Sequence, residues 1–245
     1  MPIATVISEQ GARGHMEDFH FLDLDFSGIG TIFGGVYDGH SGSYAARYAA
    51  ETLHLYFLDS AKEGVSPSGA FCSAYQKVSD DLKHQDSGTT AATFLLEKMR
   101  IHIANAGDSR IIVVGDDYVT QLTIDHRLDN AEEFKRILLS GGKIDYPYVM
   151  KGIRGLMPTR SLGDEYFRDA GVIPTPATFV HEIRDRDGWL VAATDGLFDE
   201  MDNETVARLC REHTEPRLLA ETLIREVLTG CAMPDNTTVI LVKLD

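Results

Sequence analysis

Cysteine is scarce in this sequence, and the few that occur are scattered. The 245 residues contain three cysteines, Cys72, Cys210 and Cys231. An odd and widely spaced set matches neither a disulfide framework nor a paired zinc motif. We therefore expect reduced, mostly buried thiols and an intracellular, cytoplasmic protein.

Basic residues are also in short supply. Lysine and arginine total 23 against 38 aspartates and glutamates, which gives a formal net charge of -15. Nucleic acids and anionic membrane surfaces are bound by clusters of basic residues, and the sequence has no basic run. We therefore expect neither as a partner.

Long apolar runs are missing as well. A membrane-spanning helix needs about 20 mostly apolar residues, and the charge-free stretch at residues 26–37 is shorter and interrupted by glycine. The first residues, MPIATV, lack the basic and apolar segments of a secretory signal. No coiled-coil pattern or long amphipathic tail is present, so a monomer is the default expectation.

The length and composition suit one domain spanning residues 1–245. Hydrophobic residues make up 43% and charged residues 25%, which is ordinary for a globular protein. Strands are expected near residues 2–8, 18–26, 31–37, 89–97, 100–106, 110–114, 118–123, 177–183, 188–194 and 236–243, and helices at 41–59, 66–84, 130–140, 203–213 and 216–229. Strands and helices arrive in blocks and do not alternate, which predicts an α+β fold of stacked, mixed or antiparallel sheets with helices outside.

Acidic residues stand where several expected strands begin or end. Asp38 follows the apolar run at residues 31–37, Asp195 follows residues 189–194, and Asp235 precedes residues 236–242. Glu17 and Asp18 precede another strand. A buried carboxylate is costly unless it is paired or binds a cation, and converging carboxylates and carbonyls suit Mg²⁺ or Mn²⁺ better than zinc.

Any one of these aspartates could be an ordinary turn residue, because Asp-Gly and Asp-Asn are common turn dipeptides. Their repeated placement at strand ends argues against coincidence. The pattern therefore predicts a metal site of carboxylates.

The same acidic segments resemble the PPM family of metal-dependent protein serine/threonine phosphatases, the protein phosphatase 2C type. The likeness runs in the family's order along nearly the whole chain. Its short motifs are GARGHMED at 11–18, VYDGHSG at 36–42, SGTTA at 87–91, ANAGDSR at 104–110, DH at 125–126, TRSLGD at 159–164, ATDGLFD at 193–199 and DNTTV at 235–239.

The resemblance implies a four-layer α/β/β/α sandwich, with two stacked, mostly antiparallel sheets flanked by helices. It also implies two Mg²⁺ or Mn²⁺ ions. Asp38 would bridge them, Glu17 and the Gly39 carbonyl would hold one, and Asp195 and Asp235 the other. Asp108 and Asp199 match positions that hold a weaker third ion in some members.

The implied activity is hydrolysis of phosphoserine and phosphothreonine in protein substrates by a metal-activated water. Two adjacent ions suit this chemistry because they clamp a phosphate oxygen and activate water. By resemblance, Asp18 would orient or deprotonate that water, and Arg13 would bind the phosphate. His40 would protonate the leaving oxygen, a role that suits a group titrating near neutrality.

The resemblance further implies a short flap at about residues 127–157, of which 143–157 contain Tyr146, Pro147 and Tyr148. Family members commonly carry a proline soon after the Asp-His pair, and here Asp125 and His126 are followed by none. Because the flap helps to define protein substrates, these departures bear on substrate preference.

Two other functions remain as alternatives. An inactive family member could act as a scaffold or sensor, although every expected ligand position carries an acidic side chain. A hydrolase of small phosphate esters would use the same chemistry. A cysteine-dependent phosphatase is excluded, because no arginine stands six residues after any cysteine.

Overall fold

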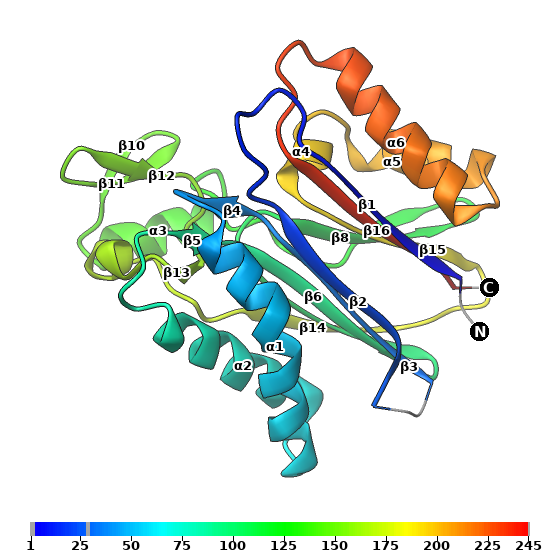
Figure 1. The fold of residues 1–245 in the computed structure, drawn as a ribbon, viewed down its shortest axis with the longest axis horizontal. Coiled ribbons are helices and arrows are strands. Elements are labelled where there is room, and N and C mark those ends of the chain that lie inside the picture. Colours follow the sequence, from blue (N-terminus) through cyan, green and yellow to red (C-terminus); the bar gives the residue numbers. More distant parts are fainter. Residues whose placement is uncertain (1–2, 28–29, 245) are drawn as a thin grey trace.

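Two five-stranded antiparallel sheets form the centre of the protein (Figure 1). A computed structural model describes residues 3–27 and 30–244, so Pro2 of the first expected strand lies outside the described residues. The first sheet has the order β1-β16-β15-β8-β9. Its strands are β1 (Ala4–Glu9), β16 (Thr237–Lys243), β15 (Asp187–Ala193), β8 (Arg110–Gly115) and β9 (Val119–Gln121).

The second sheet has the order β14-β7-β6-β3-β2. Its strands are β14 (Ala177–Glu182), β7 (Arg100–Ala106), β6 (Ala91–Glu97), β3 (Thr31–Tyr37) and β2 (Phe19–Phe26). All neighbouring strands of both sheets pair antiparallel. Each of the ten expected strands is present within a few residues of its expected bounds.

Side-chain alternation along the strands places the sheets face to face. Ile111 and Val113 of β8 pack between the two sheets, whereas Ile112 and Val114 pack beneath the helices on the outer face. Successive side chains of a strand point to opposite faces, so a continuous apolar run predicts burial on both. This is why the central strands carry little polar alternation.

Two pairs of helices cover the outer faces of the sheets (Figure 1). The helices α1 (Tyr44–Lys62) and α2 (Pro67–Asp81) pack on the second sheet, and α5 (Asn203–Glu212) and α6 (Pro216–Gly230) on the first. Small residues of α1, among them Ala45 and Ala49, are buried against the sheet. The expected four-layer sandwich is confirmed.

Smaller elements gather at one end of the sandwich. A short sheet joins β13 (Leu162–Gly163), β5 (Gly88–Thr89) and β4 (Gly39–His40), while α4 (Asp195–Phe198) follows β15 directly. The helix expected at residues 130–140 is α3 (Ala131–Leu139). The next elements are β10 (Lys143–Asp145), β11 (Tyr148–Lys151), β12 (Arg154–Leu156) and the 3-10 helix η1 (Glu165–Ala170).

The hairpin sheet β10-β11-β12 was not among the expected strands. Its members are three or four residues long, which is too short for a periodic pattern to be read. A small core of its own supports it, because Val149 and Leu156 pack with Ile137 of α3 and Phe167 of η1.

The three cysteines are all free, and their burial is lower than expected. Cys210 is buried, whereas Cys72 and Cys231 are only half-buried. Across the described ranges, no helix combines the length and the apolar character needed to cross a bilayer.

Candidate functional site

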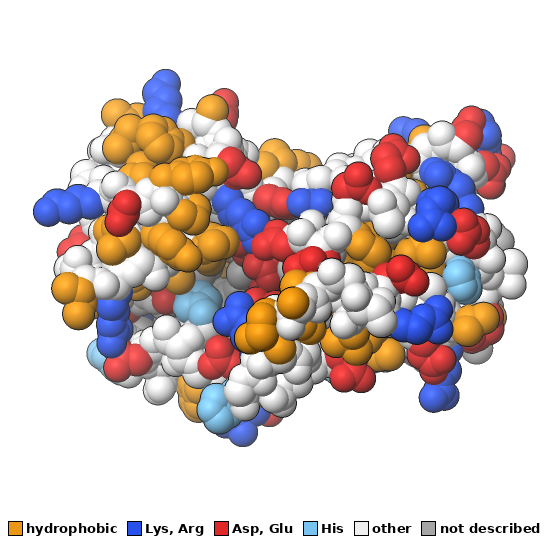
Figure 2. Space-filling view, turned by 90° about the horizontal axis from the view of Figure 1, so that it is seen from above, with side chains coloured by type: hydrophobic (Ala, Val, Ile, Leu, Met, Phe, Trp, Pro, Cys, Tyr) orange, Lys and Arg blue, Asp and Glu red, His pale blue; other side chains and the backbone are white. Residues whose placement is uncertain are grey.

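A cavity of about 530 Å³ opens at the end of the sandwich where the acidic loops meet. Figure 2 shows acidic side chains gathered in this hollow, beside a rim rich in hydrophobic side chains. Nine of the ten site residues expected from the sequence line the cavity: Arg13, Glu17, Asp38, Gly39, His40, Asp108, Asp195, Asp199 and Asp235. Asp18, the tenth, is buried beside them.

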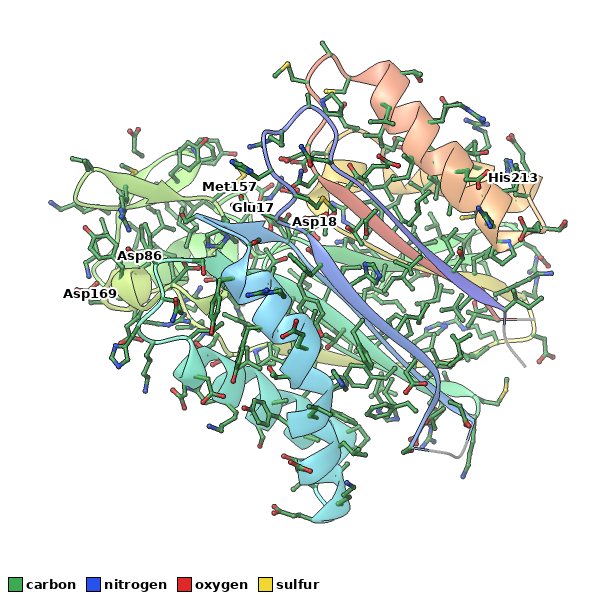
Figure 3. The ribbon with its side chains drawn as sticks, in the orientation of Figure 1. Glu17, Asp18, Asp86, Met157, Asp169 and His213 are labelled. Atoms are coloured by element: carbon green, nitrogen blue, oxygen red, sulfur yellow. The ribbon has the colours of Figure 1, made fainter. Side chains whose placement is uncertain are left out.

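The strand ends explain this convergence. Asp38 directly follows β3, Asp195 begins α4 just after β15, and Asp235 lies two residues before β16. The first comes from one sheet and the other two from its partner, so the site straddles both. Figure 3 places Glu17 and Asp18 at this end of the molecule, with Met157 nearby and His213 remote.

Asn236 fastens the loop that carries Glu17. Its side-chain oxygen accepts a hydrogen bond of 2.7 Å from the Glu17 backbone amide, and its side-chain nitrogen donates to the carbonyls of Gln10 and His15. A side chain at Gly39 would come within 2.5 Å of the Glu17 carbonyl oxygen. The close approach of these two segments therefore requires glycine at position 39.

Asp18 is a buried carboxyl with one oxygen left without a partner. The Thr194 hydroxyl donates to Oδ2 at 2.8 Å, while the buried Oδ1 has no hydrogen-bond partner. Burial, together with the nearby Asp235 and Glu17, raises the pKa of Asp18 from 3.8 to about 7. An unpartnered buried oxygen is costly and indicates a place where a further donor or cation would be stabilised.

The carboxyl groups of Asp38 and Asp195 also have raised pKa values. Burial raises the pKa of Asp38 well above its ordinary value, and the charges of Asp195, Asp18 and Asp108 raise it further. Burial, with Asp108 and Asp199 nearby, raises the pKa of Asp195 to about 7. The site thus holds more negative charge than its own residues neutralise.

Two arginines offset part of this charge. Arg13 pairs with Asp235, and Arg127 contacts Asp108, Asp195 and Asp199. Within the described parts of the chain, no three His, Cys, Asp or Glu side chains are arranged to hold an ion as they stand. The arginines help to explain this, because they occupy carboxylate oxygens of the expected ligands.

The donors nevertheless fit hard divalent cations. The candidate ligands are all oxygens, supplied by carboxylates and by the Gly39 carbonyl, which is the set that Mg²⁺ and Mn²⁺ prefer. The raised pKa values and the orphaned oxygen of Asp18 mark a site whose charge a cation would compensate.

His40 is held by a second carboxylate. Its Nε2 lies 2.8 Å from Oδ2 of Asp164, and the Ser161 hydroxyl donates to the same oxygen. Burial alone would lower the pKa of His40, but the Asp164 charge outweighs it and raises the pKa above 6.5. The contact with Asp164 therefore favours the charged form of the imidazole.

Gly88 makes room for this pair. It lies between His40 and Gly163 in the short sheet β13-β5-β4. A side chain at Gly88 would come within 2.1 Å of the Asp164 carboxylate and 2.4 Å of the His40 ring. The contact between His40 and Asp164 thus depends on glycine in the strand between them.

Sequence reasoning missed Asp164 and Arg127 as members of the site. Asp164 ends the segment TRSLGD, and Arg127 follows the Asp-His pair, so both lay beside recognised motifs. The partner of a buried ion pair leaves no periodic pattern in the sequence. The one available clue was Arg127 itself, a basic residue directly after a recognised acidic motif in a chain with few basic residues.

Comparison with known proteins agrees with this architecture. The family model for protein phosphatase 2C matches residues 4–233. A probable protein phosphatase 2C 30 from Arabidopsis thaliana is 33% identical and is matched over 85% of this chain and 56% of its own length. The protein phosphatase 2C homolog 1 of Saccharomyces cerevisiae is 29% identical over 95% of this chain and 89% of its own.

The fold has a close counterpart among solved structures. A serine-threonine phosphatase 2C from Toxoplasma gondii superposes with a TM-score of 0.86 at 20% identity, covering 99% of this chain and 94% of that one. The chain spans about half the length of several curated relatives that it matches. The family model and these likenesses show that the chain belongs to the protein phosphatase 2C family.

Proposed function

We propose that the chain is a single domain, residues 1–245, that hydrolyses phosphoserine and phosphothreonine in proteins with the aid of Mg²⁺ or Mn²⁺. One observation carries the proposal: carboxylates from both sheets line one cavity and hold more negative charge than their neighbours neutralise. Membership of the protein phosphatase 2C family supports it.

The ligands would divide between two ions. Glu17, Asp38 and the Gly39 carbonyl would hold one, and Asp38, Asp195 and Asp235 the other. Asp108 and Asp199 match positions that hold a weaker third ion in some family members. When bound, a pair of divalent ions supplies positive charge to the phosphate oxygens and lowers the pKa of water enough for attack at neutral pH.

Asp18 would orient the attacking water and accept its proton. The Thr194 hydroxyl holds Oδ2 of this carboxyl, and the buried Oδ1 has no hydrogen-bond partner. Without bound ions, burial raises the pKa of Asp18 to about 7. Cations beside it would lower that pKa and favour the carboxylate form that a base needs.

His40 would donate a proton to the leaving serine or threonine oxygen. Asp164 contacts Nε2, which leaves Nδ1 as the nitrogen free to donate. Asp164 is a positioning residue in this scheme, because it orients the ring and favours the charged imidazole.

Arg13 would bind the phosphate at the rim of the cavity. Its side chain is 62% exposed and its guanidinium contacts Asp235. A guanidinium can grip two phosphate oxygens at once, so the incoming phosphate would share or take over this contact.

The flap, residues 127–157, would help to select protein substrates. Tyr148, Leu156 and Met157 from this segment line the cavity beside the acidic site. We propose a monomer that acts on phosphoproteins inside the cell, in the cytoplasm. The three free thiols support a reducing compartment.

The test is release of phosphate from a phosphothreonine peptide with Mn²⁺, with Mg²⁺ and with EDTA. We expect activity with either metal, none with EDTA, and none in Asp38→Ala. Asp185→Ala, which removes an exposed aspartate in the turn between β14 and β15, is the matched control and should keep full activity.

Small esters such as nucleotides and sugar phosphates are assayed beside the peptide. A clear preference for them would replace the proposed substrate class. An active Asp38→Ala protein without metal would refute the proposed chemistry, and an inactive parent that still binds metal would favour a scaffold or sensor.

A further inference from the structure

Arg127 places its guanidinium among three carboxylates of the candidate site. Nε donates to Oδ2 of Asp108 at 2.6 Å, and Nη2 donates to Oδ2 of Asp195 at 2.9 Å. Asp199 is gripped at both oxygens, by Nη1 at 2.8 Å and by Nη2 at 3.0 Å. Charge-assisted hydrogen bonds of this forked kind are among the strongest that side chains make.

The surrounding chain fixes the position of Arg127. Its neighbour His126 is buried and makes two backbone hydrogen bonds. Its carbonyl accepts one from the Thr159 amide, and its amide donates one to the Gly107 carbonyl. On the other side, Leu128 is buried in the small core that also contains Val149 and Leu156. Both flanking residues are thus anchored, so the guanidinium starts from a fixed backbone.

The two arginines of the site differ in exposure. The Arg13 side chain is 62% exposed and makes one carboxylate contact, whereas the Arg127 side chain is 20% exposed and contacts three carboxylates. Arg13 can move aside at little cost, because exposed ion pairs are worth little. Displacing Arg127 would uncover Asp108, which is only 3% exposed and has the guanidinium as its cationic partner.

Two of the contacted residues, Asp108 and Asp199, are those that the family resemblance assigns to a weaker third ion, and Asp195 is an expected ligand of the second. An ion at that place would use the oxygens of Asp108 and Asp199, and Arg127 already contacts three of these as well as one oxygen of Asp195. Oδ1 of Asp195 receives no hydrogen bond from Arg127 and stays available to an ion shared with Asp38.

We propose that the Arg127 guanidinium is the resident cation of the Asp108, Asp195 and Asp199 triplet, so that this chain binds two divalent ions and excludes a third. This inference rests on the proposed function and specifies the metal content of the same site. A covalently attached cation has one consequence that an ion lacks: chelators leave it in place.

The experiment counts Mn²⁺ bound to the full chain by calorimetry and by electron paramagnetic resonance of the free ion, at millimolar Mn²⁺. We expect two ions in the parent and three in Arg127→Met, which keeps the length of the side chain and removes its charge. The double variant Arg127→Met with Asp199→Asn should return to two. Three ions in the parent, or two in a folded Arg127→Met protein, would overturn the inference.

Arg110→Met is the matched control. Arg110 is buried to a similar degree and pairs with Asp125, outside the triplet, so its loss should leave two ions. A third ion in this variant would show that any lost arginine suffices, which overturns the specific assignment to Arg127.

A second variant covers the case in which Arg127→Met does not fold. Asp199 is about half exposed, so Asp199→Asn in the parent should fold and still bind two ions, because Asp199 serves Arg127 and not an ion. A loss of one ion would overturn the inference. A parent that binds no ion would overturn the proposed function as well, whereas an active parent with three ions would overturn only this inference.

Discussion

Two buried acidic side chains, Glu133 and Asp18, lie in opposite electrostatic surroundings. Glu133 in α3 is 3% exposed, and Arg136, Arg160 and Thr159 all donate hydrogen bonds to its carboxylate. Burial alone would raise its pKa, but these partners hold the pKa far below its ordinary value. Asp18 is 4% exposed, yet its carboxyl accepts from a neutral hydroxyl, that of Thr194, and its pKa is about 7.

Burial is therefore not what distinguishes the two carboxyls, since both are almost fully enclosed. The difference lies in how many cations the chain supplies to each. The chain has only 23 basic residues against 38 acidic ones. Two of its arginines contact Glu133, whereas no basic side chain among the described residues contacts Asp18 or Asp38 directly. A paired buried carboxylate fastens α3 to the Thr159 segment, and an uncompensated one marks where a cation can bind.

The largest effect should come from Asp38→Asn, which keeps the shape of the side chain and removes the charge. We expect phosphatase activity to fall to the level measured with EDTA, because this carboxylate would bridge both ions. Stability of the metal-free protein should not fall, since the charge is uncompensated when buried. Thermal unfolding in EDTA, beside the activity assay, checks both; a strongly destabilised variant would argue that Asp38 is structural.

Glu133→Gln should show the reverse pattern. Removing one partner of a buried ion pair leaves buried arginines uncompensated and typically costs about 3–5 kcal/mol. Urea unfolding in EDTA should report a loss of this size, while metal binding stays unchanged in the protein that remains folded. A neutral effect on unfolding would remove the contrast between the two places.

Asp18 and Glu133 should affect the pH dependence of stability with opposite signs. Its folded pKa of about 7 lies above its ordinary 3.8, so the folded state loses stability at this residue as pH rises from about 4 to 7. In EDTA, Asp18→Asn should therefore gain thermal stability over the parent progressively across that range. Burial lowers the pKa of His126 to about 4, so this residue makes the folded state more stable as pH rises. Its contribution is the same in variant and parent and cancels in the difference between them. A gap that stays constant with pH would contradict the prediction.

The smallest effect should come from Thr159→Val. The hydroxyl is one of several partners of Glu133, and a hydrogen bond to a charged group is worth about 1.5–3 kcal/mol. We expect a loss within that range in urea unfolding and normal metal binding. An effect as large as that of Glu133→Gln would mean that the threonine, and not the arginines, holds the carboxylate.

Much of the architecture could be predicted from the sequence, because apolar runs and glycine turns specify strands locally. Asp38, Asp195 and Asp235 could be placed at strand ends for the same reason. The sheet β10-β11-β12 could not, since its strands are too short to show a period. Long-range partners also stayed hidden: Asp164 is 124 residues from His40, and Arg127 is 72 residues from Asp199.

The segment TRSLGD shows the limit of motif reasoning. Arg160 in this segment pairs with buried Glu133. Asp164 in the same segment contacts His40 across Gly88. The motif contains both residues. Only the structure shows that Arg160 has a structural partner and that Asp164 contacts a residue lining the cavity.

Residues from both sheets line the cavity, and this arrangement has a thermodynamic consequence. Asp38 belongs to the end of one sheet, and Asp195 and Asp235 to the other, so an ion bound among them would tie the two sheets together. Ligand that binds only the folded state adds about 1.4 kcal/mol of stability for each tenfold rise in free concentration above its dissociation constant. The melting temperature of this protein would then act as a gauge of the free divalent ion around it.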